Sequence, residues 1–137
     1  LRALVATAAF SALLAAGPAV AQFSDREYRY EPAIVVLSGV VATSTGTPAV
    51  DVGTPESREI IYLLELDRPI IVIGDATHDY NSQTEEVSAI QLTRSSPRLE
   101  FASLVGRRAR ATGRLFHGHS AYHHAKVLMM VLQIEAE

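Results

Sequence analysis

The sequence contains no cysteine at any of its 137 positions. This absence excludes a disulfide-stabilised scaffold, thiolate zinc sites, iron–sulfur ligation, a cysteine nucleophile and a lipid-modified cysteine. The formal charge is also small, at -3, which argues against a nucleic-acid-binding protein because phosphate contacts need a basic surface. Hydrophobic side chains make up 48% of the chain and charged side chains 20%, which is typical of one folded domain.

Established catalytic motifs are missing as well. The chain has no nucleophile elbow, no phosphate-binding Walker loop, no dinucleotide fingerprint and no HExxH pair. The sequence therefore indicates no reaction, and we expect a protein that is not an enzyme.

The first 21 residues have the pattern of a cleavable signal peptide. Arg2 precedes a short apolar run that ends at Gly17-Pro18, and Ala19-Val20-Ala21 supplies the small side chains that signal peptidase requires. The apolar run is shorter than the roughly 20 residues that span a bilayer, although an uncleaved membrane anchor is the alternative. We expect cleavage before Gln22 and a periplasmic or secreted protein, with no transmembrane segment in the mature chain.

The remainder predicts a β-rich domain over residues 33–137, preceded by a charged and aromatic leader at residues 22–32. Short runs of β-branched and apolar residues alternate with turn-forming residues. The expected strands are 33–41, 59–66 (with a continuation at 70–73 after a turn at 67–69), 87–93, 108–115 and 126–134. A long loop is expected at 42–57, and a short helix at 97–105 between a proline and a glycine.

Five strands with one short helix between the third and fourth predict a small OB-like Greek-key barrel. Gly113 lies within the fourth predicted strand, and a glycine inside a strand is typical of a bulge or a barrel corner. An unrelated small sandwich would fit the same number of strands.

A cluster of histidines is the most prominent candidate site. Four of the five histidines of the chain lie within eight residues, with a tyrosine among them: His117, His119, Tyr122, His123 and His124. On extended backbone the first two would point to the same side, and a chain reversal would bring the later pair opposite them. Such a set would suit Zn, Cu or Ni. Alternatively, the histidines only stack and form hydrogen bonds within a structural loop.

The position of the cluster suggests a second kind of site. In OB-folds the loops between strands 1 and 2 and between strands 4 and 5 border the usual binding face. These loops correspond to residues 42–57, which carry Asp51 and Glu56, and to residues 117–124. The arginines of the fourth predicted strand, with Arg114 nearest the loop, would meet an anionic partner or form the solvated side of a sheet.

Three stretches together resemble a known family: Tyr30 to Gly39, Leu64 to Ile70, and Thr112 to His119 followed by His123-His124 and Val127 to Met129. The pattern is similar to an uncharacterised family of small exported bacterial domains of unknown function. The resemblance covers about residues 28–134, and its most specific part is the Leu-Phe-His-x-His…His-His motif. It implies a secreted or periplasmic β-barrel-like module without established catalytic residues, found beside modules that resemble lysozyme inhibitors. Ala109 and Ala111 stand where the family has larger side chains.

We therefore expect a non-enzymatic exported binding module that contacts an unknown envelope ligand or protein through Arg114 and the residues of the histidine cluster. Two alternatives stay open, namely a metal-binding protein and an inhibitor of a secreted hydrolase such as lysozyme. A metal site predicts stoichiometric metal that is released below a pH of about 6.5, because protonated imidazole cannot ligate. A plain binding module predicts no bound metal.

The signal-peptide hypothesis predicts the N-terminus of the protein. Expression of residues 1–137 in a bacterial host should give a periplasmic protein that begins at Gln22, as measured by intact mass. Replacement of Ala21 by tyrosine should block this processing, because the cleavage pocket accepts only small side chains. An unprocessed N-terminus in the unmodified chain would contradict the prediction.

Overall fold

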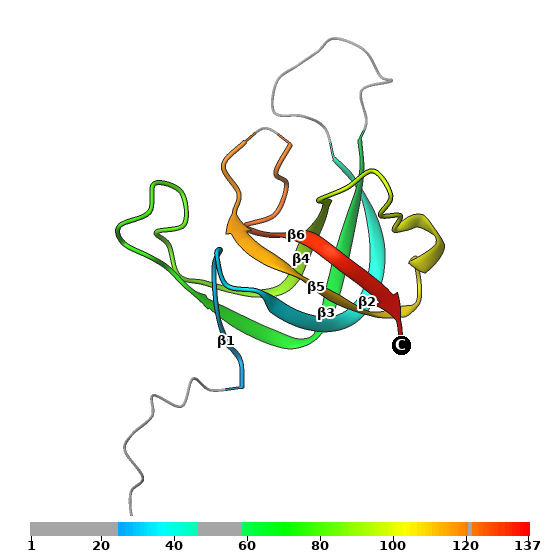
Figure 1. Ribbon diagram of the computed structural model, residues 1–137, viewed down its shortest axis with the longest axis horizontal. Helices are drawn as coiled ribbons and strands as arrows, with labels where there is room; N and C mark the ends of the chain where they lie inside the picture. The colour runs from blue at the N-terminus through cyan, green and yellow to red at the C-terminus, as the bar shows by residue number, and fades with distance from the viewer. Residues whose placement is uncertain (1–24, 47–58, 121) are drawn as a thin grey trace, which may run out of the picture.

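Figure 1 shows the computed structural model, which describes residues 25–46, 59–120 and 122–137. Its strands are β1 (Glu27–Arg29), β2 (Val35–Gly46), β3 (Glu59–Ile73), β4 (Glu85–Arg94), β5 (Arg108–His117) and β6 (Val127–Ala136). One 3₁₀ turn, η2 (Ala102–Leu104), is the only helical element in these ranges. No helix in the described part of the chain has both the length and the apolar character needed to cross a membrane.

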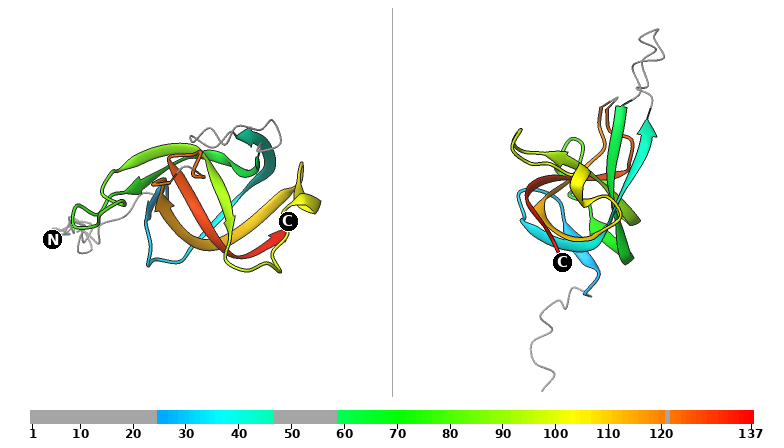
Figure 2. Two further views of the ribbon diagram at one scale, coloured as in Figure 1. Left: turned by 90° about the horizontal axis from the view of Figure 1, so that it is seen from above. Right: turned by 90° about the vertical axis from the view of Figure 1, so that its right-hand side faces the viewer.

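Five of the strands close into a barrel. β3 pairs with β2 and β4, β2 also pairs with β5, and β5 pairs with β6. The ring is completed by β4 and β6, which run parallel. When β2 to β6 are numbered 1 to 5 in chain order, their order around the barrel is 1-2-3-5-4. Both views of Figure 2 show these strands crossing around one common interior. The predicted all-β, OB-like Greek-key barrel is confirmed.

The core fills the inside of the barrel because alternate side chains of each strand point inward. In β5, the side chains of Ala109, Ala111 and Leu115 are completely buried, whereas those of Arg108 and Arg110 are exposed. The two alanines belong to one cluster with larger side chains from other parts of the chain, including Leu64, Ile90, Phe101 and Met129. Their small volume is therefore part of the packing of the barrel interior.

Two glycines allow strands to approach more closely than a side chain would permit. A Cβ atom on Gly39 would overlap the carbonyl group of Glu65 on the neighbouring strand, and one on Gly113 would overlap the carbonyl group of Met130. The register between β5 and β6 also shifts between Thr112 and Gly113. The predicted bend at Gly113 is thus present as a bulge.

The chain does not turn at residues 67–69, so that part of the prediction is wrong. β3 is one strand from Glu59 to Ile73, and its register with β4 shifts between Glu65 and Ile70. Pro69 lies within this irregularity, where no backbone N–H is required, and its carbonyl group accepts a hydrogen bond from Nε of Arg26 at 2.9 Å. β2 likewise continues to Gly46, into the beginning of the predicted loop.

The helix predicted over 97–105 is also wrong, because only the single turn η2 forms there. The side chain of Phe101 is 1% exposed and packs against Tyr62 with ring centroids 5.6 Å apart. Burial of this ring fixes the segment as an irregular connection. Glu100 then accepts a hydrogen bond from the backbone N–H of Ser103 at 2.9 Å. Tertiary packing here overrides the helical spacing of the sequence.

The expected leader takes part in the sheet. β1 pairs with β3 in parallel, with Tyr28 opposite Val72, and the side chain of Tyr30 is 4% exposed. The hydroxyl group of Tyr30 donates to the carbonyl of Gln83 at 2.9 Å, and burial together with the charge of Glu85 raises the pKa of Tyr30 to about 12. Residues 25–32 therefore pack against the barrel. The predicted divisions after residues 21 and 32 stay predictions.

The contact at Gly39 generates a stability prediction. Gly39→Ala should lower the free energy of unfolding by about 1–3 kcal/mol, because the added methyl group forces β2 and β3 apart. The matched control is Val36→Ala on the same strand, where the side chain is 51% exposed and little packing is lost. Urea unfolding measures the free energy of unfolding of both variants. Equal losses in the two would show that the close contact between Gly39 and Glu65 does not limit stability.

Candidate functional site

The histidines lie in the loop that joins β5 to β6, which we call the histidine loop (residues 117–126). Its ends are closed by a hydrogen bond from the N–H of Gly118 to the carbonyl of Lys126 at 2.9 Å. Phe116 and Leu128 are paired across β5 and β6 and are 7% and 0% exposed, although they lie outside the main core. The ring of His123 lies 5.2 Å from that of Phe116. The loop therefore folds back over the outer surface of the barrel.

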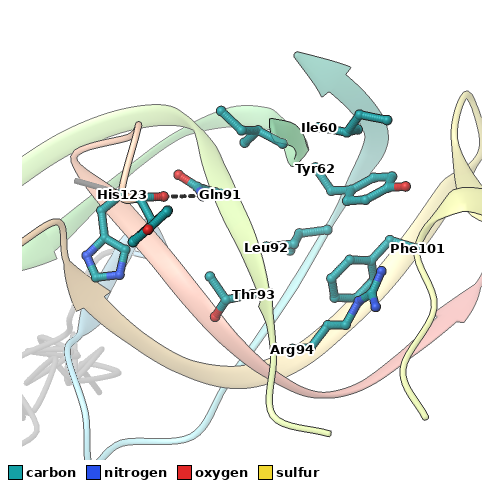
Figure 3. Close-up of a pocket in the computed structure, with 10 residues that line it drawn as sticks. Ile60, Tyr62, Gln91, Leu92, Thr93, Arg94, Phe101 and His123 are labelled. Carbon is teal, nitrogen blue, oxygen red and sulfur yellow. Dashed lines mark hydrogen bonds between the residues drawn. The ribbon is translucent and has the colours of Figure 1, made fainter. Parts of the chain in front are cut away.

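Gln91 of β4 holds the loop from below. Its side chain is 6% exposed. Nε2 donates to the carbonyl of Tyr122 at 3.2 Å, and Oε1 accepts from the backbone N–H of His124 at 2.8 Å. Figure 3 shows the first of these bonds as a dashed line. Because both ends of the buried amide are used, replacement of Gln91 by an apolar residue would remove the partners of two backbone groups of the loop.

Asn81 makes a second clamp at the other end of the loop. Its side chain is 1% exposed. Oδ1 accepts from the backbone N–H of His117 at 2.8 Å, and Nδ2 donates to Oε1 of Glu31 at 3.3 Å. The same carboxylate oxygen accepts from the hydroxyl group of Tyr80 at 2.7 Å. The histidine loop, the β3–β4 connection and the segment after β1 are thereby tied together.

The rings of His119 and His123 are in contact, with centroids 4.6 Å apart. Nδ1 of His123 accepts two backbone hydrogen bonds, from His119 at 3.0 Å and from Ser120 at 3.2 Å. Nδ1 of His119 donates to the carbonyl of His117 at 2.9 Å, and its ring stacks on that of Tyr80 at 4.0 Å. These side chains are therefore engaged in holding the shape of the loop.

His117 is oriented by oxygen atoms on both sides of its ring. Nδ1 faces the carbonyl of Gly118 at 3.0 Å, and Nε2 faces Oε1 of Glu85 at 3.2 Å. The other oxygen of Glu85 lies 3.7 Å from Nζ of Lys126. Both ring nitrogens of His117 therefore already have a partner within the protein.

Several of the ring nitrogens that the predicted metal site would use already have partners within the protein. Ligation needs an unprotonated nitrogen, but both nitrogens of His117 face oxygen atoms and Nδ1 of His123 already accepts two hydrogen bonds. Within the described ranges, no three or more His, Asp or Glu side chains are arranged to hold a metal ion. Asp51 and Glu56 of the predicted loop lie outside the described residues. Binding of Zn, Cu or Ni stays a prediction that the arrangement does not favour.

A cavity of about 410 Å³ lies between β3 and β4 beside the histidine loop. The pairing of the two strands ends at Tyr62–Leu92, and the cavity fills the space where they separate (Figure 3). Its lining residues are Ile60, Ile61, Tyr62, Gln91, Leu92, Thr93, Arg94, Phe101, Tyr122 and His123. In OB-folds this face, over strands 2 and 3, is the usual binding face.

Of the predicted contact residues, only Tyr122 and His123 line this cavity. His117, His119, His123 and His124 border a shallower depression of about 560 Å³ together with Lys126. Sequence reasoning missed the other lining residues, in particular Ile60, Tyr62, Arg94 and Phe101. The polar Gln91 between Ile90 and Leu92 was an available signal, because a buried amide inside an apolar run usually has a specific partner.

Arg114 lies away from the cavity, opposite Met130 on the outer face of β5 and β6. The other arginines of the stripe are paired with acids. Arg108 donates to both carboxylate oxygens of Asp67 at 2.6 and 2.8 Å, and Arg110 donates to Glu137 at 3.2 Å. The hydrogen bond from Arg108 lowers the pKa of Asp67. Most of the predicted basic stripe is thus used within the protein.

Comparison with known families identifies part of this architecture. Residues 89–135 match the model of a domain of unknown function (DUF4431). The DUF4431 segment runs from the middle of β4 to the end of β6 and contains Gln91, Arg94 and the whole histidine loop. The predicted resemblance to an uncharacterised domain family is confirmed over this segment. None of the curated proteins matches the chain.

The environment of His123 predicts how stability depends on pH. Burial, followed by the nearby rings of His119 and His124, lowers the pKa of His123, and protonation of Nδ1 would remove its two hydrogen bonds. Because the pKa of His123 is lower in the folded protein than in the unfolded chain, where it is about 6.5, the neutral ring stabilises the fold at pH values above about 6.5. This stabilisation is lost as the pH falls through the pKa of the folded protein. The melting temperature should therefore fall less between pH 7.5 and pH 5 in His123→Asn than in the unmodified protein, because the amide oxygen of asparagine accepts hydrogen bonds without titrating. An unchanged pH dependence in that variant would contradict the assignment.

Proposed function

We propose that the protein is an exported, non-enzymatic binding module whose ligand occupies the cavity between β3 and β4. The pattern of residues 1–21 supports export. The observation that carries the binding proposal is the cavity itself, which lies on the OB binding face and is bordered by the histidine loop. Its volume lies within the range of about 300–1,000 Å³ that small-molecule sites usually have.

The walls of the cavity are fixed before any ligand arrives. Gln91 holds the backbone at Tyr122 and at His124, and Phe101 packs its buried ring against Tyr62. A site that is already in its binding geometry loses little conformational entropy when the ligand binds. This rigidity supports a recognition site over a packing irregularity of the surface.

The rim of the cavity exposes large apolar groups. Ile60 is 61% exposed and Tyr122 is 62% exposed, and both line the cavity. Aromatic and aliphatic side chains that project from a fixed cavity supply much of the binding energy in protein recognition sites. The ligand would cover these two side chains.

An NMR titration tests this function with a panel of soluble oligosaccharides and short peptides of cell-envelope composition. At least one compound should shift the amide resonances of residues 60–62 and 91–94. Ile60→Ala should then weaken its binding by about tenfold, since loss of a large apolar contact that the ligand covers costs more than 1 kcal/mol.

The matched control is Ile34→Ala, because Ile34 is 58% exposed but does not line the cavity. Its substitution should leave the affinity unchanged. Resonance shifts that concentrate elsewhere, or an equal loss in both variants, would contradict a ligand site between β3 and β4.

A further inference from the structure

The lining of the cavity differs in charge from the rest of the chain. The sequence has 15 acidic and 12 basic residues, yet none of the ten lining residues is acidic and one, Arg94, is a permanent cation. A cavity without carboxylates does not repel an anion. The local charge therefore favours a ligand that carries negative charge.

Arg94 is held in position by an aromatic ring instead of an ion pair. Its guanidinium carbon lies 5.8 Å from the ring centroid of Phe101, and Phe101 in turn packs edge-on against Tyr62 at an interplanar angle of 66°. Figure 3 shows these three side chains gathered at one end of the cavity. Stacking orients a guanidinium group and leaves its N–H donors available.

The surroundings of Arg94 differ in this respect from those of Arg108. Arg108 donates to Asp67 and Glu137, whereas among the described residues Arg94 has no carboxylate partner within an ion-pair distance. A cation that lines a cavity with its donors unused is suited to bind the carboxylate of a ligand through two parallel hydrogen bonds.

The other polar groups of the lining are largely committed to the fold. Both ends of the Gln91 amide bind the histidine loop, and the hydroxyl group of Thr93 donates to the carbonyl of Met129 at 2.9 Å. The groups that remain for a ligand are the guanidinium of Arg94, Nε2 of His123 and the phenol groups of Tyr62 and Tyr122. The cavity thus offers one site for a negative charge and two aromatic groups with hydroxyls.

We propose that the cavity binds an acidic sugar of about disaccharide size, with its carboxylate on Arg94 and its ring against Tyr62 and Tyr122. This inference rests on the proposed function. A single arginine suits one carboxylate better than a polyanion, which requires several basic contacts. Beyond the pair Tyr62–Leu92, only residues 59–61 of β3 and 93–94 of β4 are separated, and this stretch is shorter than a typical strand. It is therefore too short to take up an extended peptide by strand addition.

Matched acid and neutral ligands test the proposal. The protein, purified as produced from expression of residues 1–137, is titrated by NMR with N-acetylglucosaminyl-N-acetylmuramic acid against diacetylchitobiose, and with cellobiouronic acid against cellobiose. Within each pair the acid carries the only carboxylate. At least one acidic sugar should bind about tenfold more tightly than its neutral partner, as expected for a hydrogen-bonded charge.

Variants assign this difference to Arg94. Arg94→Gln should abolish the preference for the acid, and Arg94→Lys should retain part of it because the charge remains without the bidentate geometry. Arg98→Gln is the control, since Arg98 is exposed and does not line the cavity, and it should bind like the unmodified protein. Thermal unfolding confirms that each variant is folded.

Several results would overturn the inference. These are equal binding of acid and neutral partner, no effect of Arg94→Gln, or no binding of any of the four sugars. Tighter binding of trialanine than of either acidic sugar would also overturn it and indicate a peptide ligand. If the neutral sugars bind as tightly as the acidic ones and Ile60→Ala weakens this binding, the proposed function stands and only the preference for an acid is refuted. If Ile60→Ala has no effect on this binding, the proposed function is refuted as well.

Discussion

The change of partner along β4 is the constraint on which the rest of the structure depends. β4 pairs antiparallel with β3 up to Leu92 and parallel with β6 from Gln91 onward. This transfer closes the barrel and at the same time separates β3 from β4, which opens the cavity. It also places Gln91 beneath the histidine loop and Arg94 next to Phe101. This one change of strand pairing therefore closes the barrel, opens the cavity and anchors the histidine loop.

The histidine loop shows how residues with catalytic potential serve a structural purpose. Imidazole nitrogens are well suited to cap backbone groups, because one accepts while the other donates. Nδ1 of His123 accepts two backbone N–H groups, and His119 donates to a carbonyl and stacks on Tyr80. Nine residues, 118–126, join the end of β5 to the start of β6. Such bonds, together with those of the buried amides of Asn81 and Gln91, set the conformation of the loop.

The sequence predicted the barrel because inward and outward side chains alternate and glycine or polar runs separate the strands. β5 illustrates this, with buried Ala109 and Ala111 between exposed arginines. The prediction failed where a local signal and the tertiary context disagreed. Pro69 indicated a turn but lies in a strand irregularity, and the helical spacing before Gly106 was overridden by the burial of Phe101.

The sequence by itself determined the class of fold, the approximate strands and the proximity of the four histidines, because all of these follow from local pattern. It could not determine the cavity, whose residues come from β3, β4, the segment before η2 and the histidine loop. Which of these side chains meet depends on strand pairing and register between positions about 30 to 60 residues apart. Tertiary structure alone therefore decided that Arg94 stacks on a buried ring at the edge of a cavity, while Arg108 and Arg110 are neutralised by acids.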